Sequence, residues 1–267
     1  MGRMNRFCAL LLNLGHALDH LFLLIFATAV ATIAADFGLA RWEDLMPYTA
    51  GAFVMFGIGS IPAGRLGDLW GRRRMMLVFY FGMGLSSLAV SLTQTPLQMA
   101  VALTVLGLFS SIYHPVGIPM LLQSAVRPGL TIGINGMSGN LGIALAAVVT
   151  GFLVKHLGWR AAFALPGLVC LVLMVWFWKV VPPELQSPAK RQQAKSMPIQ
   201  GSLAKLLLIM TLVLSYVMAL AVPVYAAGIA LLIATIFLAV IAAATSPAFS
   251  PSTRVTFQLA AANRANG

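Results

Sequence analysis

Long apolar segments dominate this sequence, and a short charged stretch between two of them, residues 64–74, reads GRLGDLWGRRR. Charged side chains and irregular backbone are costly in hydrocarbon, where no water can satisfy them. The stretch is therefore predicted to form a tight, water-facing turn between two membrane-spanning helices. Its glycines, Gly67 and Gly71, let the chain reverse direction within a few residues.

The composition supports a membrane protein. Of the 267 residues, 60% are hydrophobic and 9% are charged, whereas a soluble domain carries about 25% charged residues. We therefore expect an all-α polytopic membrane protein in the lipid bilayer. The net charge of +11 does not indicate nucleic acid, because the cations lie in short loops rather than on a patch interleaved with aromatic residues. Cys8 and Cys170 lie in apolar segments without CxxC spacing, which favours inert packing.

Six membrane spans are predicted within a bundle of residues 1–181. They run from about residue 7 to Ala35, Leu45 to Gly67, Met75 to Thr93, Leu97 to Ala125, Thr131 to Val154 and Ala161 to Val181. A polar loop, Asp36 to Asp44, separates the first two. Pro115 and Pro119 are expected to bend or break the fourth span.

Beyond the bundle the composition changes. Residues 182–205 carry four prolines and four cations, which is typical of a basic cytoplasmic linker. Residues 206–244 are apolar and long enough for one or two further spans, with Pro223 favouring a hairpin. Residues 245–267 are small and polar, and we expect a disordered tail.

The distribution of cations predicts the orientation. With the N-terminus in the cytoplasm, the outer side receives Arg41, Lys155 and Arg160. The inner side receives many more: Arg3, Arg6, Arg65, Arg72, Arg73, Arg74, Arg127, Lys179, Lys190, Arg191, Lys195 and Lys205. This asymmetry follows the positive-inside rule. We expect an integral protein of a bacterial inner membrane with a cytoplasmic N-terminus.

The charged turn matches the pattern Gly-x-x-x-Asp-x-x-Gly-Arg-Arg of major facilitator superfamily transporters, which they carry between helices two and three. The matching positions are Gly64, Leu66, Asp68, Gly71, Arg72 and Arg73. Six helices followed by a basic, proline-rich linker also resemble the N-terminal half of that fold, over about Arg6 to Lys205. Residues Ser110 to Gly117, with their Tyr-His-Pro element, look like the fosmidomycin-resistance branch of its drug exporters.

The chain departs from that family in two places and in length. Many proton-coupled members carry an arginine in helix four where this chain has Leu103, and drug antiporters often carry a Gly-Pro late in helix five that is missing here. The family fold pairs two six-helix halves around a central site. We therefore expect a truncated or frameshifted product, or a homodimer in which two copies replace the two halves.

The charged turn has two interpretations. A helix N-terminus disfavours cations, so local helix stability does not explain Arg72 to Arg74. They can set topology and contact lipid phosphates. Alternatively, Asp68 accepts bonds from cations or helix N-termini and holds the inward gate shut, the role that the resemblance also implies. The gating motif is then Gly64, Asp68, Gly71, Arg72 and Arg73.

Ionisable residues inside the spans indicate a substrate or proton pathway. His16, Asp19 and His20 are spaced i, i+3 and i+4 and share one helical face. Such groups at membrane depth are costly unless they face a cavity or a partner, although a structural hydrogen-bond network is the alternative. His114 in span four has the same two interpretations. Asn135 and Asn140 in span five either line a cavity or bring helices together.

These features favour a secondary active transporter, or the N-terminal half of one, that exports a small molecule or drug in exchange for protons. No Gly-x-x-x-x-Gly-Lys-Ser/Thr segment is present, so ATP-driven transport is not expected. An inactive fragment or non-transporting membrane subunit is the alternative. A more distant one is an intramembrane zinc metallopeptidase, since HALDH at 16–20 is spaced like His-x-x-Glu-His. We assign no cofactor and no metal ligand.

Overall fold

The computed structural model describes residues 6–123 and 125–182, which belong to the first of two compact units of the chain. Most of these residues are helical, and the described part contains no strand. The elements are α1 (Arg6–Asp36), η1 (Trp42–Thr49), α2 (Ala50–Trp70), α3 (Arg72–Ser91), α4 (Pro96–Ser110), η2 (Tyr113–Gly117), α5 (Ile118–Leu122), α6 (Pro128–Leu157) and α7 (Trp159–Val180). Except for Pro182, the expected linker, further spans and tail lie outside the described residues.

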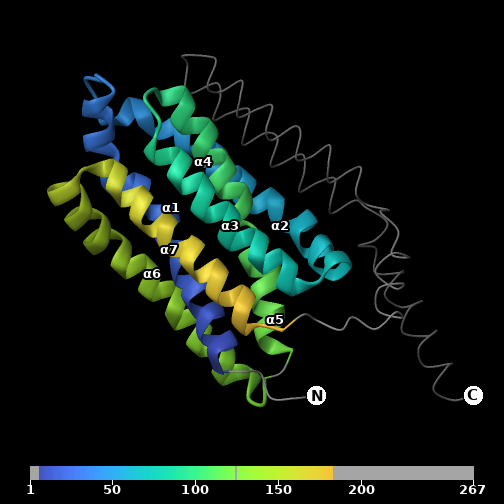
Figure 1. Ribbon diagram of the computed structural model, residues 1–267. Helices are drawn as coiled ribbons and strands as arrows, with labels where there is room; N and C mark the ends of the chain where they lie inside the picture. The colour runs from blue at the N-terminus through green and yellow to red at the C-terminus, as the bar shows by residue number, and fades with distance from the viewer. Residues whose placement is uncertain (1–5, 124, 183–267) are drawn as a thin grey trace, which may run out of the picture. The chain divides into compact units, whose positions relative to one another are not determined.

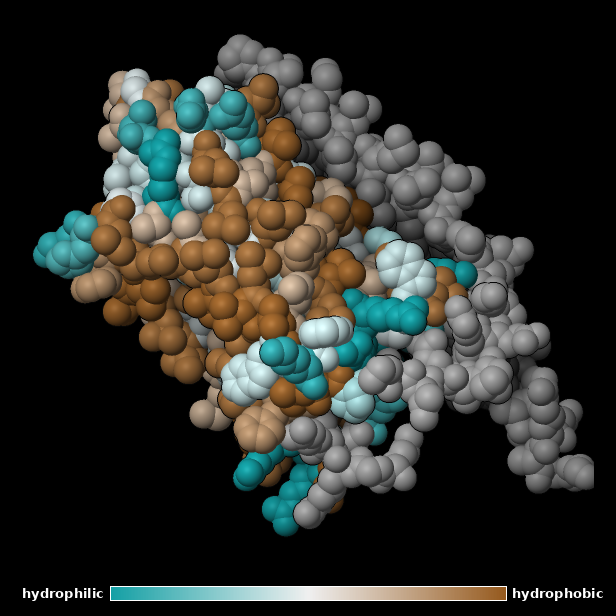
Figure 2. Space-filling model, in the orientation of Figure 1, coloured by the Kyte–Doolittle hydropathy of each residue, from teal (hydrophilic) through white to brown (hydrophobic). Residues whose placement is uncertain are grey.

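Six segments of the described chain are long and apolar enough to cross a membrane, which confirms the six predicted spans. Apolar side chains cover the middle of the face shown in Figure 2, and polar ones gather toward the ends of the helices. The second span begins differently from the prediction. The 3₁₀ helix η1 takes up part of the expected polar loop, with Glu43 and Asp44 in its first turn, where acidic side chains are favourable.

The helices pack in pairs, with α1 on α6, α3 on α7 and α2 on α4 (Figure 1). Glycine permits two of these close approaches. A Cβ atom on Gly142 of α6 would collide with the backbone carbonyl of Ala17 in α1, and one on Gly107 of α4 would collide with that of Ala52 in α2. Small residues at crossings are the usual means by which membrane helices pack tightly.

Charged and polar bonds join three helices at one end of the bundle. Arg160, at the start of α7, donates to the carboxylate of Asp36 at 2.7 Å and to the backbone carbonyl of Thr93 at 3.1 Å. The indole Nε1 of Trp159 donates to the same carboxylate at 3.2 Å. The guanidinium also lies 4.3 Å from the centre of the Trp159 ring. The ends of α1 and α3 are thereby held to the start of α7.

Candidate functional site

Polar side chains gather inside the bundle on one face of α1. His16 is 6% exposed, Asp19 is fully buried and His20 is half-buried. The helical spacing places all three on the same side, as the sequence predicts. Together with residues of the fourth and fifth spans they form what we call the polar cluster: His16, Asp19, His20, Ser110, Tyr113, His114 and Asn135.

The fourth span supplies the second side of the polar cluster because it is interrupted. Proline removes a backbone donor and its ring clashes with the carbonyl four residues earlier. As expected for Pro115 and Pro119, α4 ends at Ser110, a π-helical turn follows, and α5 continues the span. The turn brings Tyr113 against His16, with ring centres 4.7 Å apart and planes 12° from parallel. The Tyr113 hydroxyl donates to the Leu12 carbonyl at 2.7 Å.

Asp19 joins α1 to this interrupted span. Its Oδ1 accepts a hydrogen bond from the Ser110 hydroxyl. Its Oδ2 lies 3.5 Å from Nδ1 of His114, and neither of these two buried atoms has a hydrogen-bond partner. That separation exceeds a normal hydrogen bond, so a small approach of the imidazole is enough to create a charge-assisted bond.

Asn135 of α6 forms the third side of the polar cluster. Its side-chain amide donates to the Tyr113 hydroxyl at 2.8 Å and to Asn13 Oδ1 at 2.9 Å. Its backbone carbonyl lies 2.7 Å from Nδ1 of His16. Since a carbonyl can only accept, Nδ1 of His16 carries the hydrogen, and its Nε2 accepts from Nε2 of His20 at 3.1 Å.

The other predicted residue of span five does not join the polar cluster. Asn140 is exposed, whereas Asn135 is 3% exposed. Sequence reasoning also missed Asn13, although it lies three residues before His16 and so on the same face of α1. Tyr113 combines two contributions in the structure: its ring packs against His16 and its hydroxyl makes hydrogen bonds.

The charged turn lies directly beside the interrupted span. Gly71, with φ of 100°, adopts a backbone conformation that favours glycine and separates α2 from α3. A Cβ atom on Gly64 would lie 3.3 Å from Pro115, and one on Gly67 would lie 3.0 Å from Val116. The charged turn therefore packs against the π-helical turn that carries His114.

The arginines of the turn bind the carboxyl ends of other helices. Arg72 lies 3.8 Å from the Asp68 carboxylate and donates to the Pro119 carbonyl at 3.1 Å. Arg73 donates to the Val181 carbonyl just after α7. Cations are favourable at helix C-termini. This arrangement explains two cations that the dipole of their own helix disfavours, and sequence reasoning did not foresee it because the partners lie far along the chain.

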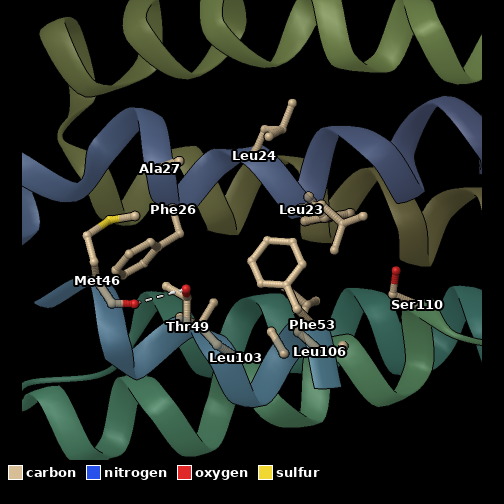
Figure 3. A pocket seen from close by; sticks show the side chains of 13 residues that line it. Leu23, Leu24, Phe26, Ala27, Met46, Thr49, Phe53, Leu103, Leu106 and Ser110 are labelled. Carbon is tan, nitrogen blue, oxygen red and sulfur yellow. Dashed lines mark hydrogen bonds between the residues drawn. The ribbon is translucent and has the colours of Figure 1, made fainter. Parts of the chain in front are cut away.

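An apolar cavity of about 100 Å³ lies between α1, α2 and α4. Figure 3 shows side chains from facing helices pointing into it, with Ser110 at one end. Its lining includes Phe22, Leu23, Phe26, Phe53 and Leu106. Because Ser110 also bonds Asp19, the cavity ends at the polar cluster. The site thus combines an apolar compartment with groups that can exchange protons.

Comparison with known proteins extends these observations. A family model described as the Major Facilitator Superfamily matches residues 12–265, well beyond Lys205, where the expected resemblance ends. A gallate transporter of Pseudomonas putida is 28% identical over 177 residues, which are 66% of this chain and 39% of that protein. The tetracenomycin C resistance and export protein of Streptomyces glaucescens is 33% identical over 127 residues, 46% of this chain and 23% of that protein.

Solved structures show the same fold. The POT family transporter PepTSo aligns with a TM-score of 0.59 at 13% identity, covering 87% of this chain and 52% of that one. The proton:xylose symporter XylE bound to 6-bromo-6-deoxy-D-glucose aligns with a TM-score of 0.57 at 19% identity, covering 79% of this chain and 53% of that one. The chain thus spans about half the length of these transporters and less than two fifths of the curated relatives described above.

Proposed function

Because the chain belongs to the major facilitator superfamily, we propose that it forms the membrane-embedded half of a secondary active transporter that exports a small molecule in exchange for protons. The observation that carries the proposal is Asp19, a carboxyl group fully buried within a membrane span and facing His114. An ionisable group at this depth is by default functional. Members of this family are transporters rather than enzymes, so the metallopeptidase interpretation is not kept.

The proposed substrate has an apolar, aromatic-sized body. The cavity beside Ser110 is lined by phenylalanine, leucine and alanine side chains, and its volume approaches the roughly 150 Å³ of cavities that bind benzene. A polar end of the substrate would meet the polar cluster. Relatives support export: besides the tetracenomycin C protein, a puromycin resistance protein of Streptomyces alboniger is 26% identical over 135 residues.

Alternating access requires a second half of the transporter, relative to which this six-helix bundle can move. We propose that a second six-helix unit completes the transporter in a bacterial inner membrane. The charged turn would act as its gate on the cytoplasmic side. In support, Arg72 already links Asp68 to the end of α5, so a movement of the turn is transmitted to the span that carries His114.

A transport assay tests the proposal. Cells that lack their own drug exporters, when they produce the chain, should tolerate more puromycin, and everted vesicles from them should release protons when puromycin is added. Asp19→Asn keeps the shape of the side chain but cannot gain or lose a proton, and it should abolish both effects. Asp68→Asn should reduce them by weakening the gate.

The matched control is Asp44→Asn, since Asp44 is an exposed carboxylate in η1 and lies outside the polar cluster. It should transport like the unaltered chain. Equal transport by Asp19→Asn and the unaltered chain, at equal amounts in the membrane, would contradict the assigned role of Asp19. No puromycin transport by any of these proteins would favour the non-transporting subunit instead.

A further inference from the structure

Three histidine rings from two distant parts of the chain converge in the polar cluster. His16 and His20 come from α1 and His114 from η2, and one ligand nitrogen of each ring lies within 4.8 Å of those of the others. We propose that these three imidazoles bind one transition-metal dication of the Zn²⁺ class. The sequence supplies the pair at i and i+4, and the break in span four supplies the third ligand.

The spacing of the first two rings suits a shared ion. Zn–N bonds of about 2.0–2.1 Å at a tetrahedral angle hold the two nitrogens about 3.3 Å apart. The Nε2 atoms of His16 and His20 are 3.1 Å apart. The ring of His114 stands edge-on to both, with centres 5.1 Å from that of His16 and 5.6 Å from that of His20. An approach of about 1–2 Å by the third ligand nitrogen completes the set.

The partners of the other ring nitrogens support the same inference. A histidine that binds a metal through one nitrogen typically donates the other N–H to a carbonyl or a carboxylate. His16 donates from Nδ1 to the Asn135 carbonyl. Nδ1 of His114 faces Oδ2 of Asp19 at 3.5 Å, and these are the two buried polar atoms of the polar cluster that have no hydrogen-bond partner. A bound ion that turned His114 toward the other rings would bring these two atoms within hydrogen-bond distance of each other.

The surroundings favour a borderline-soft cation over a hard one. Three imidazoles suit Zn²⁺, Co²⁺, Ni²⁺ or Cu²⁺, whereas Mg²⁺ and Ca²⁺ prefer oxygen ligands. A bound dication would favour the ionised form of the neighbouring Asp19 carboxyl group, and that negative charge would reduce the cost of a dication within the membrane. His20 and His114 are only half-buried, which leaves a fourth position open to water or a substrate group. Gly139 of α6 leaves space for the rings, since a Cβ atom there would lie 2.8 Å from His16 and 2.9 Å from His20.

Metal titration of the purified full-length chain tests the proposal without any transport measurement, so its outcome is separate from that of the proposed function. The protein is purified in detergent without a polyhistidine tag, treated with a chelator and titrated with Co²⁺ and then Zn²⁺. We expect one ion per chain, with the visible absorption of tetrahedral Co²⁺. His20→Gln and His114→Gln should each weaken binding by about 100-fold, and Asp19→Asn by about 10- to 100-fold.

The matched control is His156→Gln, because His156 is the fourth histidine of the chain and is exposed near the end of α6. It should bind like the unaltered protein. Loss of binding in this variant, full binding by His114→Gln, or a stoichiometry far below one ion per chain would overturn the proposal. If the variants do not fold, the unaltered chain still tests the proposal, because Zn²⁺ must raise its melting temperature and Mg²⁺ must not.

Discussion

At the scale of single residues, Tyr113 organises the polar cluster. Its ring stacks on His16, and its hydroxyl donates to the Leu12 carbonyl while accepting from the Asn135 amide. One side chain thus fixes the distance between α1, the interrupted span and α6. The ring packs against His16, and the hydroxyl makes the two hydrogen bonds. One substitution can separate these two contributions.

Tyr113→Phe keeps the ring and removes the hydroxyl. The Leu12 carbonyl and the Asn135 amide each lose a buried partner, which costs about 1–3 kcal/mol. For a chain of this size each kcal/mol lowers the melting temperature by about 2–4 °C. Thermal melting of the purified protein, followed by circular dichroism, measures the shift. Tyr48→Phe is the control, since Tyr48 is half-exposed in η1; an equal shift in both variants would contradict the role of the hydroxyl.

The sequence identified part of the polar cluster for a clear reason. His16, Asp19 and His20 belong to one helix, whose period alone places them together. The approach of His114 to Asp19 depends on contacts 95 positions apart in the chain, and the sequence could only mark both as unusual at membrane depth. Asn135 and Asn140 have the same local signals, and only the packing of α6 against α1 separates the buried one from the exposed one.

At the scale of helices, close crossings depend on glycines that no side chain can replace. Gly142 lets α6 lie against the backbone of α1, which carries His16. Gly136 of the same helix has no such function, because nothing lies within 4 Å of a Cβ atom built on it. The sequence shows that α6 is rich in glycine, but it does not show which of them lies at the crossing.

Gly142→Ala and Gly136→Ala should therefore act in opposite directions. The first places a methyl group against the Ala17 carbonyl, and overpacking of this kind costs about 1–3 kcal/mol. The second meets open space and gains about 0.5–1 kcal/mol from the higher helix propensity of alanine. Melting temperatures of the two variants in the same detergent compare them. A stable Gly142→Ala protein would mean that α1 and α6 are not packed as described.

At the scale of the whole molecule, the orientation in the membrane is predicted from the distribution of cations. The six spans were predictable because length and apolarity are local properties of the sequence. The helix η1 was missed because its polar residues are typical of a loop. The side of the membrane on which each turn lies remains a prediction. Arg74 and Lys155 are both exposed and lie at opposite ends of their spans, so they report on it directly.

Arg74→Cys and Lys155→Cys are made in a chain whose buried Cys8 and Cys170 are replaced by alanine. A membrane-impermeant maleimide should label the Lys155→Cys protein in intact cells. It should label the Arg74→Cys protein only after the membrane is permeabilised, because positively charged turns remain in the cytoplasm. The reverse labelling pattern would invert the topology.

The bond from Arg73 to the Val181 carbonyl joins positions 108 residues apart, and this has a consequence for synthesis. At about 5–20 residues per second, a ribosome needs roughly 5–20 s to add those 108 residues. The bond between Arg160 and Asp36 spans 124 positions and must wait for the same helix. The first five spans are therefore synthesised before either of these two bonds can form, and the arrival of α7 completes both.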